Sequence, residues 1–315
     1  MNRKLLEWLC CPCACGELAL SAERWAGDEI EEGLLRAPCG LEFPIRNGIP
    51  RFVSSDGYCD SFSFEWKVHR RTQLDSANVG TRMAGASESA FATRVGFPLS
   101  ELAGKLVLDA GCGAGRYAEV AAKHGAVVVA IDLSFSVDAA RENLRGLPNV
   151  HVIQADIFSL PFSPGTFDFV YSFGVLHQTP DCEKAFKQLP RLLKSGGKLS
   201  VAIYSSYNKA IVYSSEAWRS ITTRLPKKLL YCLSFVSVPL YFIYRIPVIG
   251  HICRGIFVIP MLPDWRWRVL DTYDWYSARY QSKHTHWEVF RWFEDEGLTD
   301  IKVNPGEVTM LGTKI

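Results

Sequence analysis

Short apolar segments alternate with helix-like segments between residues 104 and 204, and this alternation constrains the fold more than any other feature. The apolar segments are residues 105–110, 126–131, 150–154, 167–171 and 199–203. Helical patterns separate several of them, at residues 116–124, 137–145 and 183–193. Nearly continuous apolar strands joined by helices indicate a parallel sheet covered by helices on both faces. The sequence therefore predicts an α/β fold.

A glycine-rich loop follows the first of these strands and opens a helix. Its glycines are Gly111, Gly113 and Gly115, and glycine lets a backbone turn sharply and approach a ligand closely. Asp109 precedes the loop, and Asp132 ends the next strand, where a carboxylate can accept hydrogen bonds from both hydroxyls of a ribose. A dinucleotide-dependent oxidoreductase is the main alternative. Its usual loop is Gly-x-Gly-x-x-Gly, whereas the spacing here is Gly-x-Gly-x-Gly.

These motifs together resemble those of class I S-adenosylmethionine-dependent methyltransferases. The glycine loop with Asp109, then Asp132, Ala155-Asp156 and residues 167–172 agree with that family in order and spacing. The likeness is greatest to the group that contains the ubiquinone/menaquinone-type small-molecule methyltransferases, and it covers residues 104–204. It implies a Rossmann-like, seven-stranded methyltransferase sheet, with S-adenosylmethionine as the cofactor.

The resemblance also implies which residues bind the cofactor. They are Asp109, Gly111, Gly113, Gly115, Asp132, Leu133, Asp156, Ile157 and Ser172. The glycine loop would pass beneath the methionine part of the cofactor, whose amino group Asp109 would help to hold. Asp132 would bind the ribose, Asp156 the adenine amino group, and Ile157 the face of the adenine. Residues 172–174 would lie under the sulfonium and border the substrate.

Residues 1–53 are expected to form a separate, β-rich module. They hold five of the ten cysteines, and Asn47-Gly48 is a tight-turn signal between short apolar runs, which predicts a hairpin. Residues 11–18, 39–40 and 43–50 resemble the small zinc-ribbon-like domain known as an activator of tRNA and protein methyltransferases.

The predicted zinc ligands of this module are Cys10, Cys13, Cys15 and Cys39. The sequence departs from the family pattern of two Cys-x-x-Cys pairs, because Arg36 stands where a partner of Cys39 would be. A tetrahedral zinc site requires four ligands, which the first cysteines and Cys39 can supply. The alternative is a ribbon that has lost its metal and is held together by apolar packing. In both cases we assign the module to scaffolding or substrate recruitment.

Residues 54–103 are predicted to form an N-terminal helical lid. The stretch from Phe62 to Asp75 resembles one that precedes the core in bacterial methyltransferases with the same ribbon, and the implied role is to cover the cofactor. Phe62, Trp66 and His69 share one face at helical spacing. The alternative is an amphipathic helix that packs on the edge of the sheet.

Residues 205–284 are predicted to be a helical cap insertion, and residues 285–315 the final helix and strands of the core. The cap follows the fifth strand, at the carboxyl edge where α/β sheets bind ligands. Residues 229–244 carry no charge but are interrupted by Pro239, and they are shorter than the about 18 residues of a membrane span. Residues 205–254 hold seven Lys or Arg side chains against one acid. Peripheral membrane contact through residues 224–262 is one interpretation. An ordinary cap with snorkelling basic side chains is the other.

The predicted catalytic candidates are His177, Asp274, Tyr276 and His284. His177 follows the fourth strand, although in the resembling group a histidine there is more often structural. The other three belong to a segment dense in aromatic and polar residues, which would form either an acceptor pocket with a proton acceptor or a packed cap.

The expected function is methyl transfer from S-adenosylmethionine to a small, lipophilic or aromatic acceptor, through an O, S, N or C nucleophile that the sequence leaves open. The alternatives are a nucleic-acid or protein methyltransferase recruited through the ribbon, and a non-catalytic S-adenosylmethionine-binding partner protein. A net charge of +2 gives no strong attraction to nucleic acid. The first residues show no secretory signal, so we expect a cytoplasmic protein, with membrane association through the cap. The sequence does not indicate an oligomeric state.

Overall fold

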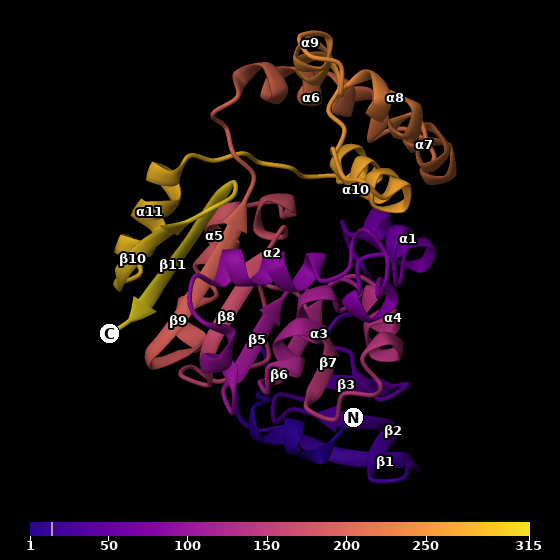
Figure 1. The fold of residues 1–315 in the computed structure, drawn as a ribbon. Coiled ribbons are helices and arrows are strands. Elements are labelled where there is room, and N and C mark those ends of the chain that lie inside the picture. The colour runs from indigo at the N-terminus through magenta and orange to yellow at the C-terminus, as the bar shows by residue number, and fades with distance from the viewer. Residues whose placement is uncertain (14) are drawn as a thin grey trace.

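The computed structural model describes residues 1–13 and 15–315, and its centre is a seven-stranded mixed sheet (Figure 1). The strands lie in the order β10-β11-β9-β8-β5-β6-β7. Their bounds are Leu106–Ala110 (β5), Val127–Asp132 (β6), Val150–Gln154 (β7), Phe167–Phe173 (β8), Leu193–Ile203 (β9), Leu298–Asn304 (β10) and Val308–Lys314 (β11). Strands β5 to β9 pair in parallel, and β11 runs antiparallel to both of its neighbours. This arrangement is typical of Rossmann-like methyltransferases and confirms the predicted fold class.

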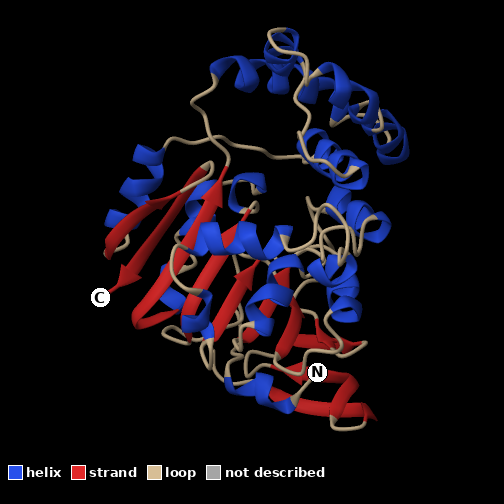
Figure 2. Cartoon of the chain, in the orientation of Figure 1, coloured by secondary structure: helices blue, strands red, loops and turns tan. Residues whose placement is uncertain are grey.

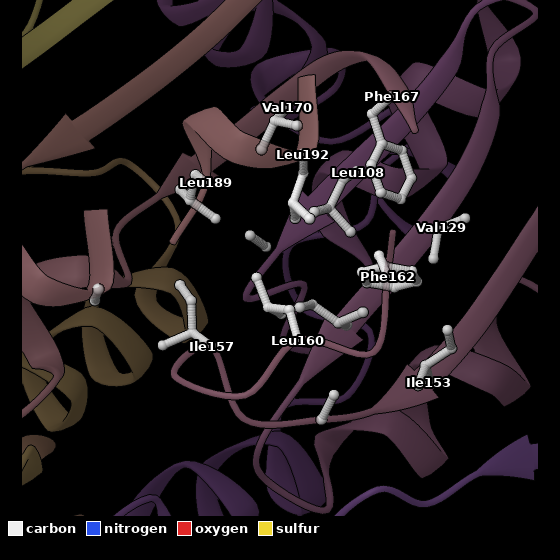
Figure 3. Close-up of a cluster of buried hydrophobic side chains, with 14 of the residues drawn as sticks. Leu108, Val129, Ile153, Ile157, Leu160, Phe162, Phe167, Val170, Leu189 and Leu192 are labelled. Carbon is white, nitrogen blue, oxygen red and sulfur yellow. The ribbon is translucent and has the colours of Figure 1, made fainter. Parts of the chain in front are cut away.

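Helices cover both faces of this sheet, because successive strand residues point to opposite sides. Val107 of β5 belongs to the cluster under α2 (Ala86–Val95), α3 (Arg116–Lys123) and α4 (Ser136–Asn143). The next residue, Leu108, belongs to the opposite cluster, which includes side chains of α5 (Cys182–Phe186) and α11 (His286–Asp295). Figure 3 shows part of this second cluster, with Leu108, Val129 and Ile153 from three strands facing Phe162. The sheet is therefore buried on both faces.

The predicted N-terminal β module is a four-stranded antiparallel sheet in the order β1-β2-β3-β4, preceded by the short 3₁₀ helix η1 (Arg3–Glu7). Its strands are Ala19–Ala26, Glu29–Arg36, Glu42–Arg46 and Ile49–Pro50. Asn47 and Gly48 both have positive φ, as the predicted hairpin turn between β3 and β4 requires. The backbone N–H of Phe52 donates to the carbonyl of Gln154 over 2.8 Å, so the chain that leaves the module continues along the edge of β7.

The segment between the module and the core is short helices and turns. Helix α1 (Asp60–Val68) packs against α4 and α10 at the carboxyl end of the sheet, where the lid was expected. Two 3₁₀ turns, η2 (Asp75–Ala77) and η3 (Leu99–Leu102), flank α2.

The insertion after β9 is helical, as predicted, and lies above the carboxyl edge of the sheet (Figures 1 and 2). Its helices are α6 (Lys209–Thr222), α7 (Lys227–Ser234), α8 (Ser237–Ile243), α9 (Ile249–Ile256) and α10 (Trp265–Ser277). Helix α10 begins where the Asp264 carboxylate accepts the N–H groups of Arg266 and Trp267, and it packs against α6, α7 and α8. Across the described ranges, the helices include none that is both long and apolar enough to cross a membrane.

The helix predicted over residues 183–193 is shorter than expected. Helix α5 ends at Phe186, and a 3₁₀ turn, η5 (Pro190–Leu192), leads directly into β9. Proline lacks the N–H that an α-helix interior requires, so Pro190 ends the helix instead of kinking it. Helix α11 carries a capping box in which Thr285 and Glu288 satisfy each other's backbone N–H groups.

Candidate active site

A cavity of about 590 Å³ lies at the carboxyl ends of β5, β6 and β8, between the core and the cap. Its walls include Gly113 of the glycine loop, Asp132 of β6, Trp66 of α1 and Asp274 of α10. This volume is in the usual range for pockets that take small ligands. The cavity therefore joins the predicted cofactor site to the predicted acceptor site in one space.

The glycine loop is shaped by contacts that leave no room for side chains. Gly111 has a φ of 99°, and a Cβ there would overlap the side chain of Val175. Gly113 donates its N–H to the Asp132 carboxylate over 2.9 Å. A Cβ on Gly113 would meet the ring of Trp66 at 3.1 Å, so the helix α1 lies directly against the loop. These contacts form the narrow backbone cradle that the sequence indicated.

Asp132 lies at the wall of the cavity, at the end of β6. Besides the Gly113 N–H, its carboxylate accepts the backbone N–H of Ser134 over 2.8 Å and the Ser134 hydroxyl over 2.6 Å. Burial raises the pKa of this carboxyl. Leu133 and Ile157 line the cavity beside it, on the side where the adenine was expected.

Four of the predicted cofactor residues are not among the side chains that line the cavity. The Asp156 carboxylate accepts the N–H of Phe158 over 2.9 Å, and the Ser172 hydroxyl donates to the carbonyl of Ala110 over 2.7 Å. Gly115 starts α3 with a φ of 91°, packed against the side chain of Leu144. Asp109 is buried, which raises its pKa to about 8. For Ser172 and Gly115 the observed contacts are structural, joining β5 to β8 and α3 to its neighbours.

Three carboxyl groups gather in the half of the cavity nearer the cap. Asp274 accepts a hydrogen bond from Gln178 over 3.0 Å and another from the Tyr204 hydroxyl over 3.4 Å. Asp271 accepts one from Gln73 over 2.9 Å. Burial raises the pKa of Asp274 to about 6 and that of Asp271 to about 7.

The third carboxyl is Glu65 of α1. It is 1% exposed, and its Oε2 has no hydrogen-bond partner among the described residues. Burial raises the pKa of Glu65 well above the ordinary value, and the neighbouring carboxyl groups of Asp274 and Asp271 raise it further.

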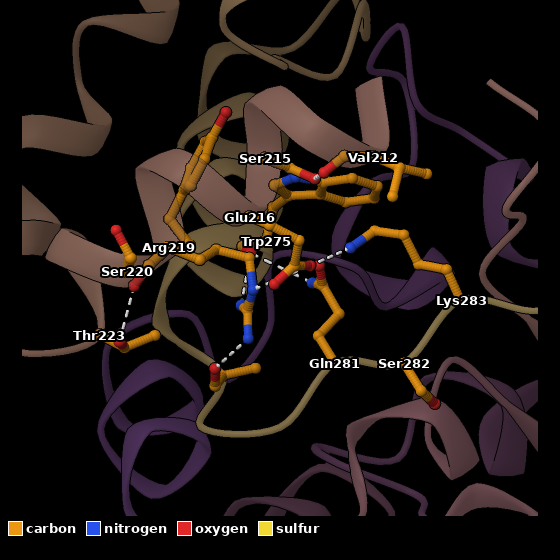
Figure 4. A network of polar contacts seen from close by, with 12 residues as sticks. Val212, Ser215, Glu216, Arg219, Ser220, Thr223, Trp275, Gln281, Ser282 and Lys283 are labelled. Carbon is orange, nitrogen blue, oxygen red and sulfur yellow. Dashed lines mark hydrogen bonds and ion pairs between the residues drawn. The ribbon is translucent and has the colours of Figure 1, made fainter. Parts of the chain in front are cut away.

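Aromatic side chains form the wall around these acids. The ring of Tyr204 lies 3.8 Å from that of His177 and 4.7 Å from that of Trp275, measured between centroids. The backbone carbonyl of Trp275 is held by Arg219 over 3.0 Å and by Gln281 over 3.1 Å (Figure 4).

The same polar network continues to the end of the cap. Arg219 also donates to the carbonyl of Ala278 over 2.7 Å, and Glu216 pairs with Lys283. The network thus fixes α6, the end of α10 and the chain that returns to the core, and it holds Trp275 at the cavity.

The structure separates the four catalytic candidates. Asp274 and His177 line the cavity. Both nitrogens of His177 are buried without a partner among the described residues, and burial lowers its pKa to about 3. Such a ring is uncharged at neutral pH and serves as packing under Tyr204.

Tyr276 and His284 were predicted as catalytic candidates, and neither is among the residues that line the cavity. The Tyr276 hydroxyl accepts the N–H of Val258 over 2.8 Å and donates to the carbonyl of the same residue. His284 contacts the hydroxyl of Ser282 over 2.9 Å and packs edge-on against Trp292. Both are therefore engaged in holding the cap and the returning chain.

Sequence reasoning missed Glu65, Gln73, Asp271 and Gln178, all of which line the cavity. One signal was available for Asp271, since it precedes Asp274 by three positions and residues at that spacing share a helix face. Glu65 and Gln73 gave no comparable signal, because their burial depends on how α1 and the turn after it pack on the cap.

The N-terminal cysteines form a cluster in which the sulfur atoms of Cys11, Cys13, Cys15 and Cys39 all lie within 4.8 Å of one another. The Cys11 sulfur is 3.1 Å from that of Cys13 and 3.7 Å from that of Cys39. Zinc–sulfur bonds of about 2.3 Å place the sulfurs of a tetrahedral site about 3.8 Å apart. The donor set and its spacing therefore fit a structural zinc ion.

Cys10 was predicted to be one of the four ligands, and the structure replaces it with Cys11. The backbone of Cys10 is paired on both sides, since its N–H donates to the carbonyl of Pro161 and it forms a bridge with Glu17. Neighbouring residues in an extended segment point to opposite sides, so only one of the two adjacent cysteines can face the cluster.

Comparisons with known proteins agree with this geometry. Residues 108–201 match the family described as a methyltransferase domain. The chain is 34% identical over 128 residues to a ubiquinone biosynthesis O-methyltransferase of Coxiella burnetii, covering 40% of this chain and 55% of that protein. It is 39% identical over 106 residues to a demethylmenaquinone methyltransferase of Thermobifida fusca, covering 32% and 44%. The chain thus spans about half the length of the curated relatives it matches.

Among solved structures, magnesium protoporphyrin IX methyltransferase from Synechocystis with bound SAH is 16% identical, with a TM-score of 0.48 over 82% of this chain and 98% of that one. Three observations agree with one another. They are the order of the strands in the sheet, the glycine loop at the carboxyl ends of these strands, and the match of residues 108–201 to a methyltransferase domain. The fold and the site at the centre of this chain, together with the match over residues 108–201, support a class I, S-adenosylmethionine-dependent methyltransferase domain.

Proposed function

We propose that this protein transfers a methyl group from S-adenosylmethionine to a small, lipophilic or aromatic acceptor held between the core and the cap. The observation that carries the proposal is the single cavity lined by the glycine loop and Asp132 on one side and by Tyr204, Trp275 and Asp274 on the other. The relatives named for ubiquinone and menaquinone biosynthesis support an acceptor of this kind.

The described residues fit the cofactor. Gly111 and Gly113 form a cradle that side chains would fill, which suits the methionine part, and Asp132 would accept the ribose hydroxyls. Among the described residues, one carboxylate oxygen of Asp109 has no hydrogen-bond partner, which supports a role in holding the amino group. Ile157, which lines the cavity, would pack on the adenine, and the neighbouring Asp156 would hold its amino group.

The methyl donor is already activated by its sulfonium, so the chain must orient the acceptor, exclude water and accept a proton. We assign the proton to Asp274. As the acceptor atom bonds to the methyl carbon and the carbon–sulfur bond breaks, an O–H or acidic C–H proton would pass to the Asp274 carboxylate. Gln178 and the Tyr204 hydroxyl donate to that carboxylate and would hold it in place.

The cysteine cluster has a different role in this proposal. One zinc ion bound by Cys11, Cys13, Cys15 and Cys39 would stabilise the ribbon and take no part in methyl transfer. The ribbon lies at the opposite end of the molecule from the cap, which supports scaffolding (Figure 1).

The decisive experiment incubates the purified full chain with S-adenosylmethionine and a panel of lipophilic and aromatic metabolites. The expected result is one acceptor whose mass increases by one methyl group, with release of S-adenosylhomocysteine. Tight S-adenosylhomocysteine binding without any methylated product would instead favour a non-catalytic binding protein. Absence of binding, measured by calorimetry, would contradict the cofactor assignment itself.

A further inference from the structure

The outer helices of the cap expose an unusual amount of apolar surface. Of the 24 large apolar side chains that are exposed in the described chain, 16 lie between residues 205 and 284. The most prominent include Phe242 of α8, which is 64% exposed, and Val248 and Ile252 around α9, which are 73% and 58% exposed. Single exposed apolar residues are ordinary, but a concentration of this kind marks an interaction surface.

The charges of the same segment have one sign. Residues 217–263 contain no Asp or Glu and six Lys or Arg residues. Arg219 is buried in the polar network of the cap, and Lys227 pairs with Asp60 over 2.6 Å. The other four are Arg224, Lys228, Arg245 and Arg254, which are exposed and have no ion-pair partner among the described residues. Since the whole chain has a net charge of only +2, the rest of the molecule is net negative.

The arrangement of the helices leaves this surface facing outward. Helices α7 and α8 pack on α10 with their inner sides, and α9 packs on α6 (Figure 1). Their outer sides, at the end of the molecule farthest from the ribbon, have no partner within the described chain. On the inner side, Ile211, Val258 and Ile259 of the same insertion line the cavity.

We propose that the outer face of α7, α8 and α9, with the turn at residues 244–248, lies on the surface of an anionic phospholipid bilayer. The apolar side chains would enter the boundary between headgroups and acyl chains, and the four unpaired basic side chains would contact lipid phosphates. A bilayer offers anionic charge directly above an apolar layer, which complements both properties of this face at once. The proposal goes beyond methyl transfer and does not depend on it.

The first test mixes the full chain with vesicles of phosphatidylcholine alone or of phosphatidylcholine with phosphatidylglycerol, and measures co-sedimentation. The expected result is binding to the anionic vesicles, much weaker binding to the neutral ones, and a loss of affinity at high salt. Failure of the parent chain to bind anionic vesicles at low salt would overturn the proposal.

The second test compares two variants that each remove four exposed positive charges. The cap variant is R224Q/K228Q/R245Q/R254Q, and the matched control, outside the cap, is R71Q/K105Q/R145Q/K302Q. The cap variant is expected to partition on the order of 100-fold more weakly, because each basic side chain near an anionic surface adds to the attraction. The control is expected to bind nearly as the parent does, and an equal loss in both variants would reduce the effect to net charge and contradict the proposal.

A third variant, F242S/V248S/I252S, removes apolar side chains and keeps every charge. We expect its vesicle binding to fall by at least about tenfold, because buried apolar area contributes to interfacial binding. Unchanged binding would mean a contact with polyanions in general, nucleic acid included, and would overturn the bilayer assignment. A parent dimer that this variant dissociates, with no vesicle binding, would mean that a second copy covers the face. Thermal unfolding confirms that each variant is folded, independently of any cofactor.

Discussion

The ribbon and the cap are both additions to the same methyltransferase core, but they join it in different ways. Apolar residues of the ribbon, such as Leu5, Ile30 and Leu35, belong to one buried cluster with Ile153 and Phe162 of the core. The cap has its own small buried cluster, built around Leu230, Tyr273 and Tyr276, and exposes 16 of its other large apolar side chains. The ribbon therefore shares a buried cluster with the core, whereas the cap has a separate one.

Polar contacts show the same contrast. The Arg51 side chain of the ribbon donates to the Asp138 carboxylate of α4 over 2.6 Å. The network around Arg219 joins parts of the cap to one another, and the Asp274 carboxylate of the cap accepts a hydrogen bond from Gln178 of the core. A region whose apolar side chains share the buried core of the molecule is suited to stability. A region that keeps a cavity on one side and an exposed apolar face on the other is suited to ligands and partners.

The largest effect that would test this contrast is loss of the metal from the ribbon. We expect about one zinc per chain in the parent, almost none in Cys11→Ser, and parental content in Cys10→Ser. Structural zinc sites contribute about 10 kcal/mol or more of binding free energy, so loss of one ligand also destabilises the module. Elemental analysis of protein purified without chelator measures the content. If Cys10→Ser removed the metal and Cys11→Ser retained it, the observed cluster would be wrong.

In the cap, the largest expected effect belongs to Asp274→Asn, once an acceptor is known. The substitution keeps the shape of the side chain and removes the proton acceptor, so kcat/KM should fall by about 10²–10⁴-fold. The pKa of Asp274 is raised to about 6, and only the ionised form takes a proton, so parental kcat/KM should decline as the pH falls through about 6. The variant should lack this decline. A variant with the parental rate and pH profile would remove Asp274 from the mechanism.

Two leucine substitutions compare the packing of the regions directly. Leu35→Ala in the ribbon opens a cavity in the shared cluster, where Leu35 is fully buried, and should cost about 3 kcal/mol of unfolding free energy. Leu233→Ala in α7 removes a side chain that is 51% exposed and should cost less than about 0.5 kcal/mol. Chemical denaturation of both variants measures the difference. Equal costs would show that the cap is as firmly built as the ribbon.

The smallest effect concerns the core between the two regions. Asp132→Ala should weaken S-adenosylhomocysteine binding, expected in the micromolar range for the parent, by about 1–3 kcal/mol through lost hydrogen bonds to a charged group. Calorimetry of the two proteins provides the comparison, and Leu233→Ala, far from the loop in sequence, serves as the control that keeps full affinity. Equal binding by Asp132→Ala and parent would refute the ribose assignment.

The sequence was most informative where the structure of a segment depends on the residues of that segment alone. Apolar runs predicted five strands of the sheet, and Asn47-Gly48 predicted the hairpin, because strand burial and positive φ depend on the residues themselves. It was least informative at the short helix α5, where Pro190 acted against a helical pattern. It also favoured Tyr276 and His284, whose polar groups are used by neighbouring backbone and side chains instead of the cavity.

The amino-acid sequence by itself determined the class of fold, the glycine loop and Asp132. The spacing of the glycines and a carboxylate at the end of an apolar run are each local features of the chain. Only the tertiary structure decided that Cys11 and not Cys10 joins the cluster, and that Glu65, Asp271 and Asp274 share one cavity. Asp271 and Asp274 lie on one helix, but Glu65 precedes them by more than 200 positions in the chain. Their meeting depends on the packing of α1 and α10 over the sheet, which no local pattern specifies.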